Sequence, residues 1–198
     1  TYKHTVDPAD GDRGDEMYQS LLESFDGHGE LALKKFIQAY LASVASVDDL
    51  VGEVLDALDN SRLKDNTIVI FTCDNGENGK KMNASEDGPR VPFIVMCPGL
   101  IQQSGTTDEL MEFSDIYPTL MEFSGASVPD GYALDGQSLV PFLTGATDMH
   151  REWITSYIAT ARMVRTKRWL LEAVDPVYGD AAGRLFDCGD AYLRSDYK

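Results

Sequence analysis

One apolar run with an abrupt polar end constrains the fold of this chain most. Residues 67–73 (TIVIFTC) are rich in β-branched and aromatic side chains, which is typical of a strand buried on both faces. Asp74, Asn75 and Gly76 follow and predict a sharp turn at its carboxyl end. In open α/β sheets, ligands bind at such ends, and the carboxylate and amide oxygens of this turn suit Ca²⁺ or Mg²⁺. For the tripeptide alone, an ordinary Asn-Gly turn without a metal is the alternative.

Composition and charge limit the classes of partner. Hydrophobic residues make up 43% of the 198 residues and charged residues 25%, as in folded globular domains. The formal net charge of −16 argues against nucleic acid, because phosphate contacts need clustered Lys and Arg, and against anionic membrane surfaces. No apolar run approaches the roughly 20 residues that span a bilayer, and the first residues carry no apolar signal-peptide core. We therefore predict no nucleic-acid partner and no membrane partner.

Hydrophobic spacing predicts three parts of the chain. Residues 1–30 are acidic and rich in Gly, and we interpret them as a surface segment. Apolar residues at three- and four-residue spacings over 31–58 predict one helix roughly 42 Å long. The strand 67–73, a polar loop over 74–89 and a second apolar strand over 90–97 then complete a layered α/β domain spanning 31–149.

The remaining elements are shorter. Residues 109–113 predict a short strand, and Asp115 is a candidate N-cap for a helix over 116–123 that stops at Gly125. Residues 153–157, 161–174 and 184–188 predict antiparallel strands exposed on one face, which form a small subdomain over 150–198. Cys73 and Cys97 are predicted to be small buried hydrophobes, because both lie in apolar, strand-like segments. No disulfide framework is visible, so the cysteines do not indicate the compartment.

A series of short motifs resembles the sulfatases of the alkaline-phosphatase-like superfamily. The segment KMNASEDGPRVP over 81–92 follows Asp74 and Asn75 and is similar to the family's Lys-x-x-x-x-Glu-Gly-Gly-x-Arg-Val-Pro. Further matches occur in the family's order, so coincidence is a poor explanation. They are the helix motif within 39–52, DNTIVIFT at 65–72, DIYPTL at 115–120, DGQSLVPFL at 135–143 and the small-sheet segments 165–169 and 184–187.

The resemblance implies a function for three residues. Asp74 and Asn75 occupy the positions of two ligands of the family's divalent metal, usually Ca²⁺, and Lys81 that of the lysine that contacts the sulfate ester, with Lys80 as the less favoured choice. A sulfuryl group crowded with anionic oxygens needs a cation before a nucleophile can approach, and a lysine then stabilises the developing charge. Arg90 is interpreted as structural and Glu86 as a carboxylate that fixes the loop.

The match breaks where the family's nucleophile should be. That nucleophile is a formylglycine made from a Cys/Ser-x-Pro-x-Arg motif, and the sequence contains no such motif and no equivalent of the paired aspartates that complete the metal site. The simplest expectation is that this chain is the carboxyl-terminal portion of a sulfatase, with the formylglycine in the other portion. His4, His28 and His150 lack the pattern of the family's active-site histidines and are interpreted as solvated or core residues, with His4 as the outside candidate.

Three functions remain open. The first is hydrolysis of a small-molecule or carbohydrate sulfate ester, to which this chain supplies two metal ligands and a lysine. The second is a phosphodiesterase or phosphonate monoester hydrolase of the same superfamily, and the third is a non-catalytic acidic α/β module. The isolated chain is expected to lack activity, to bind metal weakly because two ligands are too few, and to self-associate through exposed apolar surface. The family suggests a periplasmic or extracellular location.

Overall fold

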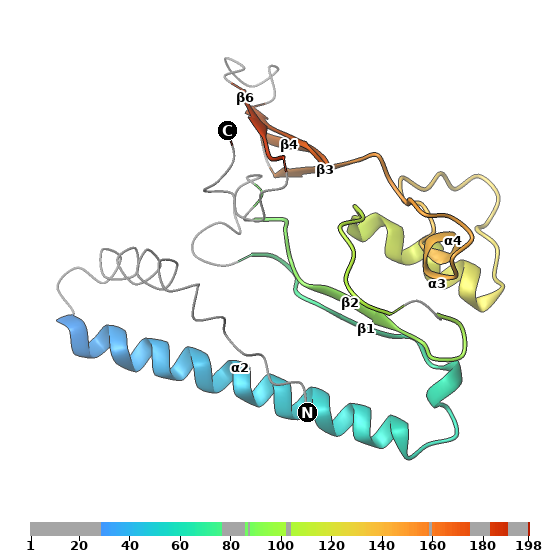
Figure 1. Cartoon of the computed structure of the whole chain (residues 1–198), viewed down its shortest axis with the longest axis horizontal. Coiled ribbons are helices and arrows are strands. Elements are labelled where there is room, and N and C mark those ends of the chain that lie inside the picture. Colours follow the sequence, from blue (N-terminus) through green and yellow to red (C-terminus); the bar gives the residue numbers. More distant parts are fainter. Residues whose placement is uncertain are drawn as a thin grey trace. The chain divides into compact units, whose positions relative to one another are not determined.

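The computed structural model describes residues 29–76, 86, 88–101, 104–158, 160–174, 183–189 and 198. The predicted surface segment over 1–30 lies almost wholly outside these residues. The chain forms two compact units, Thr1–Arg62 and Leu63–Lys198, and Figure 1 shows their elements. The division into 1–30, 31–149 and 150–198 stays a prediction.

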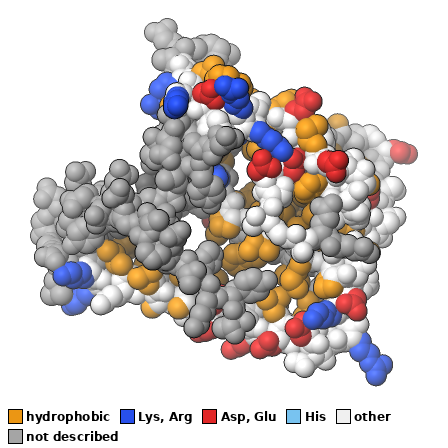
Figure 2. Space-filling view, viewed as in Figure 1, with side chains coloured by type: hydrophobic (Ala, Val, Ile, Leu, Met, Phe, Trp, Pro, Cys, Tyr) orange, Lys and Arg blue, Asp and Glu red, His pale blue; other side chains and the backbone are white. Residues whose placement is uncertain are grey.

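The first unit contains one long helix. Helix α2 spans Gly29–Asp59, which confirms the helix predicted over 31–58. Hydrophobic side chains are visible along it in Figure 2, and the large ones that are exposed are Phe36, Tyr40, Leu41, Val44, Val47, Leu50 and Val54. The predicted self-association through exposed apolar surface stays a prediction. Among the described residues, no helix is both long and apolar enough to cross a membrane.

The second unit begins with a two-stranded antiparallel sheet. After a short 3-10 helix η2, Lys64–Asn66, strand β1, Val69–Thr72, pairs with β2, Phe93–Met96, so that Val69 lies opposite Met96. All four residues of β1 are half-buried, so the strand is shorter and more exposed than predicted. Cys97 is only 1% exposed, as predicted. Cys73 is exposed, so the prediction of burial was wrong there, because this residue follows the last paired position of β1.

Two helices of this unit lie side by side (Figure 1). Helix α3 spans Ile116–Ser124 and ends at Gly125, whose φ of 68° is left-handed, so the predicted stop is confirmed. Helix α4 spans Val140–Leu143. The strand predicted over 109–113 was wrong, because a 3-10 helix η3, Phe113–Asp115, leads into α3 instead. A Cβ at Gly136 would lie 1.8 Å from the Ser114 carbonyl oxygen, so this close approach requires glycine.

A four-stranded antiparallel sheet follows, in the order β3-β4-β5-β6. The predicted antiparallel strands are confirmed, but the single segment predicted over 161–174 forms two strands, β4 and β5. The strands are Trp153–Ile158, Ala161–Thr166, Trp169–Val174 and Arg184–Asp187. Exposed and half-buried residues alternate along β3, as expected for a sheet with one solvated face. Its small core contains Met163, Leu170 and Cys188.

A buried carboxylate joins the helical part of this unit to the start of β3. Asp115 is fully buried. Arg151 Nε donates to its Oδ1 at 3.1 Å and to its Oδ2 at 2.9 Å, and Arg151 Nη2 donates to Oδ1. Its Oδ2 also lies 3.0 Å from His150 Nε2 and accepts the backbone N–H of Glu112, while Oδ1 accepts that of Gln137. Asp115 precedes α3, but its side chain makes no capping hydrogen bond to that helix. His150 is thus a core histidine, one of the two states predicted for it.

These contacts set the ionisation of Asp115. Burial alone would raise its pKa, but the hydrogen bonds from Arg151, the Gln137 and Glu112 backbones and His150 together lower the pKa below the ordinary 3.8. The same pair raises the pKa of Arg151 through its hydrogen bond to Asp115. The carboxylate and guanidinium therefore stay charged together at neutral pH.

Replacement of Asp115 by Asn tests this network. Asp115→Asn leaves the buried Arg151 guanidinium without its main counter-charge, and we expect a loss of about 3–5 kcal/mol in the free energy of unfolding. Urea denaturation measures the change. Asp130→Asn, at an exposed position, is the matched control and should change stability by less than about 0.5 kcal/mol. Equal stability of the two variants would contradict the role given to Asp115.

The lowered pKa of Asp115 also predicts a pH dependence. Because its pKa is lower in the folded state than the ordinary 3.8, the carboxylate contributes its full stability above pH 3.8 and loses it as pH falls through the folded-state pKa. Denaturation between pH 6 and pH 2 should show this acid loss in the parent chain. The difference in stability between the parent and Asp115→Asn should shrink over the same range, and a constant difference would exclude the linkage.

Candidate functional site

The turn after β1 holds the two predicted metal ligands. The backbone N–H of Asn75 donates to Oδ1 of Asp74 at 2.8 Å, and the side-chain nitrogen of Asn75 donates to the carbonyl oxygen of Gly76 at 3.1 Å. Asp74 is exposed and Asn75 is half-buried. The turn is thus shaped by its own side chains, while the second oxygen of Asp74 and the amide oxygen of Asn75 have no bond to described residues.

The turn is fastened to the chain that returns toward β2. Gly76 donates its N–H to the carbonyl oxygen of Gly88 at 2.7 Å, and Thr72 Oγ1 donates to the Pro92 carbonyl oxygen at 2.8 Å. Lys81 and Lys80 lie outside the described residues. The role predicted for Lys81 in substrate contact and catalysis therefore stays a prediction.

Glu86 anchors this return to the four-stranded sheet. It is a buried acid, 6% exposed, and its Oε1 accepts a hydrogen bond from Arg165 Nε on β4 at 2.9 Å. Arg90 lies 3.7 Å from the other oxygen of Glu86, and the Glu86 N–H donates to Glu172 Oε1 on β5 at 3.2 Å. These contacts agree with the loop-fixing role expected of Glu86. Together with the Gly76–Gly88 hydrogen bond, they connect the end of β1 to Arg165 on β4 and Glu172 on β5.

The oxygen donors at the turn fit a hard divalent cation. Asp74 offers a carboxylate oxygen at the surface, and Asn75 can offer an amide oxygen beside it, which are ligand types that Ca²⁺ accepts. A Ca²⁺ ion takes six to eight oxygens. No group of three or more His, Cys, Asp or Glu that could hold a metal occurs in the described part of the chain. The two residues therefore fit as part of a larger ligand set.

A pocket beside the start of β3 escaped the sequence analysis. It includes His150 and Arg151, which are held by Asp115, together with the exposed Trp153. The sequence signal was available in two forms, a His-Arg pair just before a strand and an aromatic residue on that strand's solvated face. Neither points to Asp115 about 35 residues earlier, so the pocket emerges only from the folded chain.

Comparisons with known proteins identify relatives of most of the chain. A family model described as Sulfatase matches residues 3–126. Arylsulfatase H of Homo sapiens is 32% identical over 164 residues, which cover 70% of this chain and 29% of the relative. The chain thus spans less than a third of that curated relative.

Two solved structures show the same fold. One, determined in complex with its substrate D-glucosamine-2-N,6-O-disulfate, has a TM-score of 0.67 at 24% identity and covers 86% of this chain and 38% of its own. The other comes from work on the metabolism of multiple glycosaminoglycans by Bacteroides thetaiotaomicron. It has a TM-score of 0.61 at 27% identity and covers 75% of this chain and 36% of its own.

Loss of the Glu86 anchor should loosen the turn that carries Asp74. Arg165→Met leaves the buried Glu86 carboxylate short of a donor, which should cost about 2 kcal/mol of stability and speed hydrogen exchange at the Gly76 N–H. Arg168→Met is the control, because Arg168 forms an exposed pair with Asp187 at 2.8 Å, and the loss of a solvent-exposed pair should change stability little. Unchanged exchange at Gly76 in Arg165→Met would show that the anchor does not reach the turn.

Proposed function

This chain belongs to the sulfatase family, and from that membership we propose that it forms part of an enzyme that hydrolyses sulfate esters. The observation that carries the proposal is the turn at Asp74 and Asn75, which presents two hard oxygen donors at the carboxyl end of a strand. Family membership supports the reaction class. The activity itself is assigned to the whole enzyme, because the chain covers only 29% of the human relative.

In this proposal, Asp74 and Asn75 supply two ligands to a Ca²⁺ ion. When bound, such an ion neutralises the anionic oxygens of the ester. The chain's own contribution is to fix those ligands, since Asn75 N–H orients the Asp74 carboxylate and the Gly76–Gly88 hydrogen bond closes the turn. Lys81 is proposed to contact the sulfate group. The remaining ligands and the formylglycine nucleophile are assigned to sequence outside these 198 residues.

We propose a sulfated carbohydrate as substrate. The glycosaminoglycan context of a neighbour that is 27% identical supports this class. Local groups must attract the anionic substrate, because the net charge of −16 repels it at long range. A bound cation and Lys81 would supply that attraction, in the compartment outside the cytoplasm that the family suggests.

Sulfate release tests the proposal. The product of the complete reading frame should release sulfate from sulfated glycosaminoglycan disaccharides in the presence of Ca²⁺, whereas the 198-residue chain alone should not. Asp74→Ala should reduce turnover by at least about tenfold and weaken Ca²⁺ binding, measured by calorimetry, by a similar factor. Asp130→Ala should match the parent protein in both assays.

Two other results would replace the proposal. Turnover of a phosphonate monoester or phosphate diester without turnover of any sulfate ester would assign the chain to a phosphoryl-directed hydrolase of the same fold. A complete product with neither Ca²⁺ affinity nor hydrolysis would indicate a non-catalytic module.

A further inference from the structure

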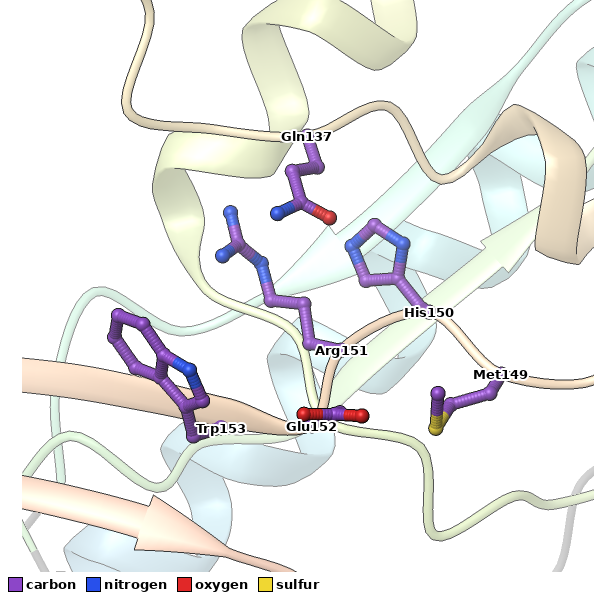
Figure 3. A pocket seen from close by; sticks show the side chains of 6 residues that line it. All are labelled: Gln137, Met149, His150, Arg151, Glu152 and Trp153. Atoms are coloured by element: carbon purple, nitrogen blue, oxygen red, sulfur yellow. The ribbon is translucent and has the colours of Figure 1, made fainter.

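A pocket opens beside the amino-terminal end of β3, well separated in sequence from the Asp74 turn. Its volume is about 230 Å³, and its lining residues are Gln137, Met149, His150, Arg151, Glu152 and Trp153. Figure 3 shows Gln137 entering from one side and Trp153 from the other, with His150 and Arg151 extending between them. The residues come from two segments that Asp115 holds together.

The pocket is fixed by contacts that leave its outer groups available. His150 and Arg151 are engaged by the Asp115 carboxylate, and the same carboxylate accepts the backbone N–H of Gln137 at 2.8 Å. Arg151 also donates to the Asp135 carbonyl oxygen at 3.3 Å. Because these bonds set the backbone on both sides of the pocket, it is organised before any ligand arrives.

Three polar groups of the lining have no partner among the described residues. They are the side-chain amide of Gln137, the carboxylate of Glu152 and the indole N–H of Trp153. The Trp153 side chain is 53% exposed, so its large ring faces solvent on one side of the hollow. An exposed aromatic ring with free hydrogen-bonding groups around it is a recognition surface with an apolar platform and polar edges.

A sugar ring has the complementary chemistry. One face of a pyranose presents C–H groups that can lie against an aromatic ring, and its rim carries hydroxyls that donate and accept hydrogen bonds. We propose that this pocket binds one uncharged pyranose unit, which stacks on Trp153 and bonds to Gln137 and Glu152. The inference rests on the proposed function, because it places a second contact on the same carbohydrate substrate.

The charges of the pocket favour an uncharged unit over a sulfated one. Glu152 contributes an exposed carboxylate, and the Arg151 guanidinium is already neutralised by Asp115 and by Glu112 at 3.5 Å. An anion entering the pocket would meet Glu152, and the described residues that line the pocket offer no cation beyond the already paired Arg151 to offset it. A hydroxyl group, in contrast, can donate to Glu152 and accept from Gln137 and Trp153.

A neighbouring hollow indicates that more than one ring can be accommodated. It has a volume of about 300 Å³, shares Met149, Arg151 and Glu152 with the first pocket and continues to Thr166, Lys167 and Arg168. Lys167 pairs with Glu109 and Asp108, and Arg168 pairs with Asp187. The two hollows together match an oligosaccharide better than a single compact ligand.

Intrinsic fluorescence tests the pocket directly, because Trp153 and Trp169 are the two tryptophans of the sequence. Trp169→Phe leaves Trp153 as the reporter, and Trp153→Phe leaves Trp169. Each protein is titrated with cellobiose, lactose and N,N′-diacetylchitobiose. At least one disaccharide should change Trp153 emission with half-saturation in the millimolar range, while the Trp153→Phe protein should show no saturable change.

Further variants separate specific binding from a general aromatic effect. In the Trp169→Phe background, Gln137→Ala and Glu152→Ala should each weaken the best disaccharide by about three- to tenfold, because each removes one hydrogen bond. Tyr132→Ala removes another aromatic side chain, 73% exposed and absent from the pocket lining, and should leave the affinity unchanged. Sodium sulfate should produce no saturable response.

The outcomes distinguish this inference from the proposed function. Saturable binding that depends on Trp153, Gln137 and Glu152 supports the pocket even if the complete product hydrolyses no sulfate ester. Absence of binding to all three disaccharides, or an equal response in Trp153→Phe, overturns it even if hydrolysis is found. A saturable response to sodium sulfate alone would assign the pocket to an anion and also overturn the proposal.

Discussion

The pairing of Asp115 with Arg151 is the interaction on which the unit Leu63–Lys198 most depends. One buried carboxylate binds a guanidinium, an imidazole and two backbone N–H groups, and so joins the start of α3, the segment before α4 and the entry to β3. Few large apolar side chains are buried in the described part of this unit. An ion pair is a weak source of net stability, but its geometry specifies one arrangement of the segments it joins. Here it supplies the specificity that a small apolar core does not.

A second buried carboxylate plays a comparable part near the candidate metal site. Glu86 is held by Arg165 on β4 and by Arg90, and its N–H donates to Glu172 on β5. Figure 2 shows charged side chains of both signs over the four-stranded sheet β3–β6. The Asp74 turn is therefore linked to the small sheet through polar contacts. We therefore expect the conformation of the turn to depend on the integrity of that sheet, although the two are far apart in the sequence.

The sequence predicted the elements that a pattern of neighbouring residues specifies. It missed the features that depend on contacts between residues far apart in the chain. Helix α2 and strands β3 to β6 follow from periodicities of 3.6 and 2 residues. The strand predicted over 109–113 was wrong. A run of five residues gives the same sequence signal for a strand and for an extended segment that leads into a 3-10 helix. Cys73 was misplaced by the same uncertainty at the end of β1. Asp115 was recognised only as a cap, because its partner Arg151 lies 36 residues away and no local pattern records the pair.

The net charge of −16 makes contact with uncharged parts of a substrate physically useful. At distances beyond about 8 Å, salt screens most of the repulsion between the acidic chain and a sulfated polymer. At the shorter distances within the site, this repulsion persists. In the proposed function, a cation at Asp74 would bind one sulfate group, and every further sulfate on the substrate would add repulsion. The proposed stacking of an uncharged ring on the exposed Trp153 would add binding free energy without adding charge. If the whole enzyme acts on an anionic carbohydrate, as proposed, recognition of rings that carry no sulfate would add affinity without adding electrostatic repulsion.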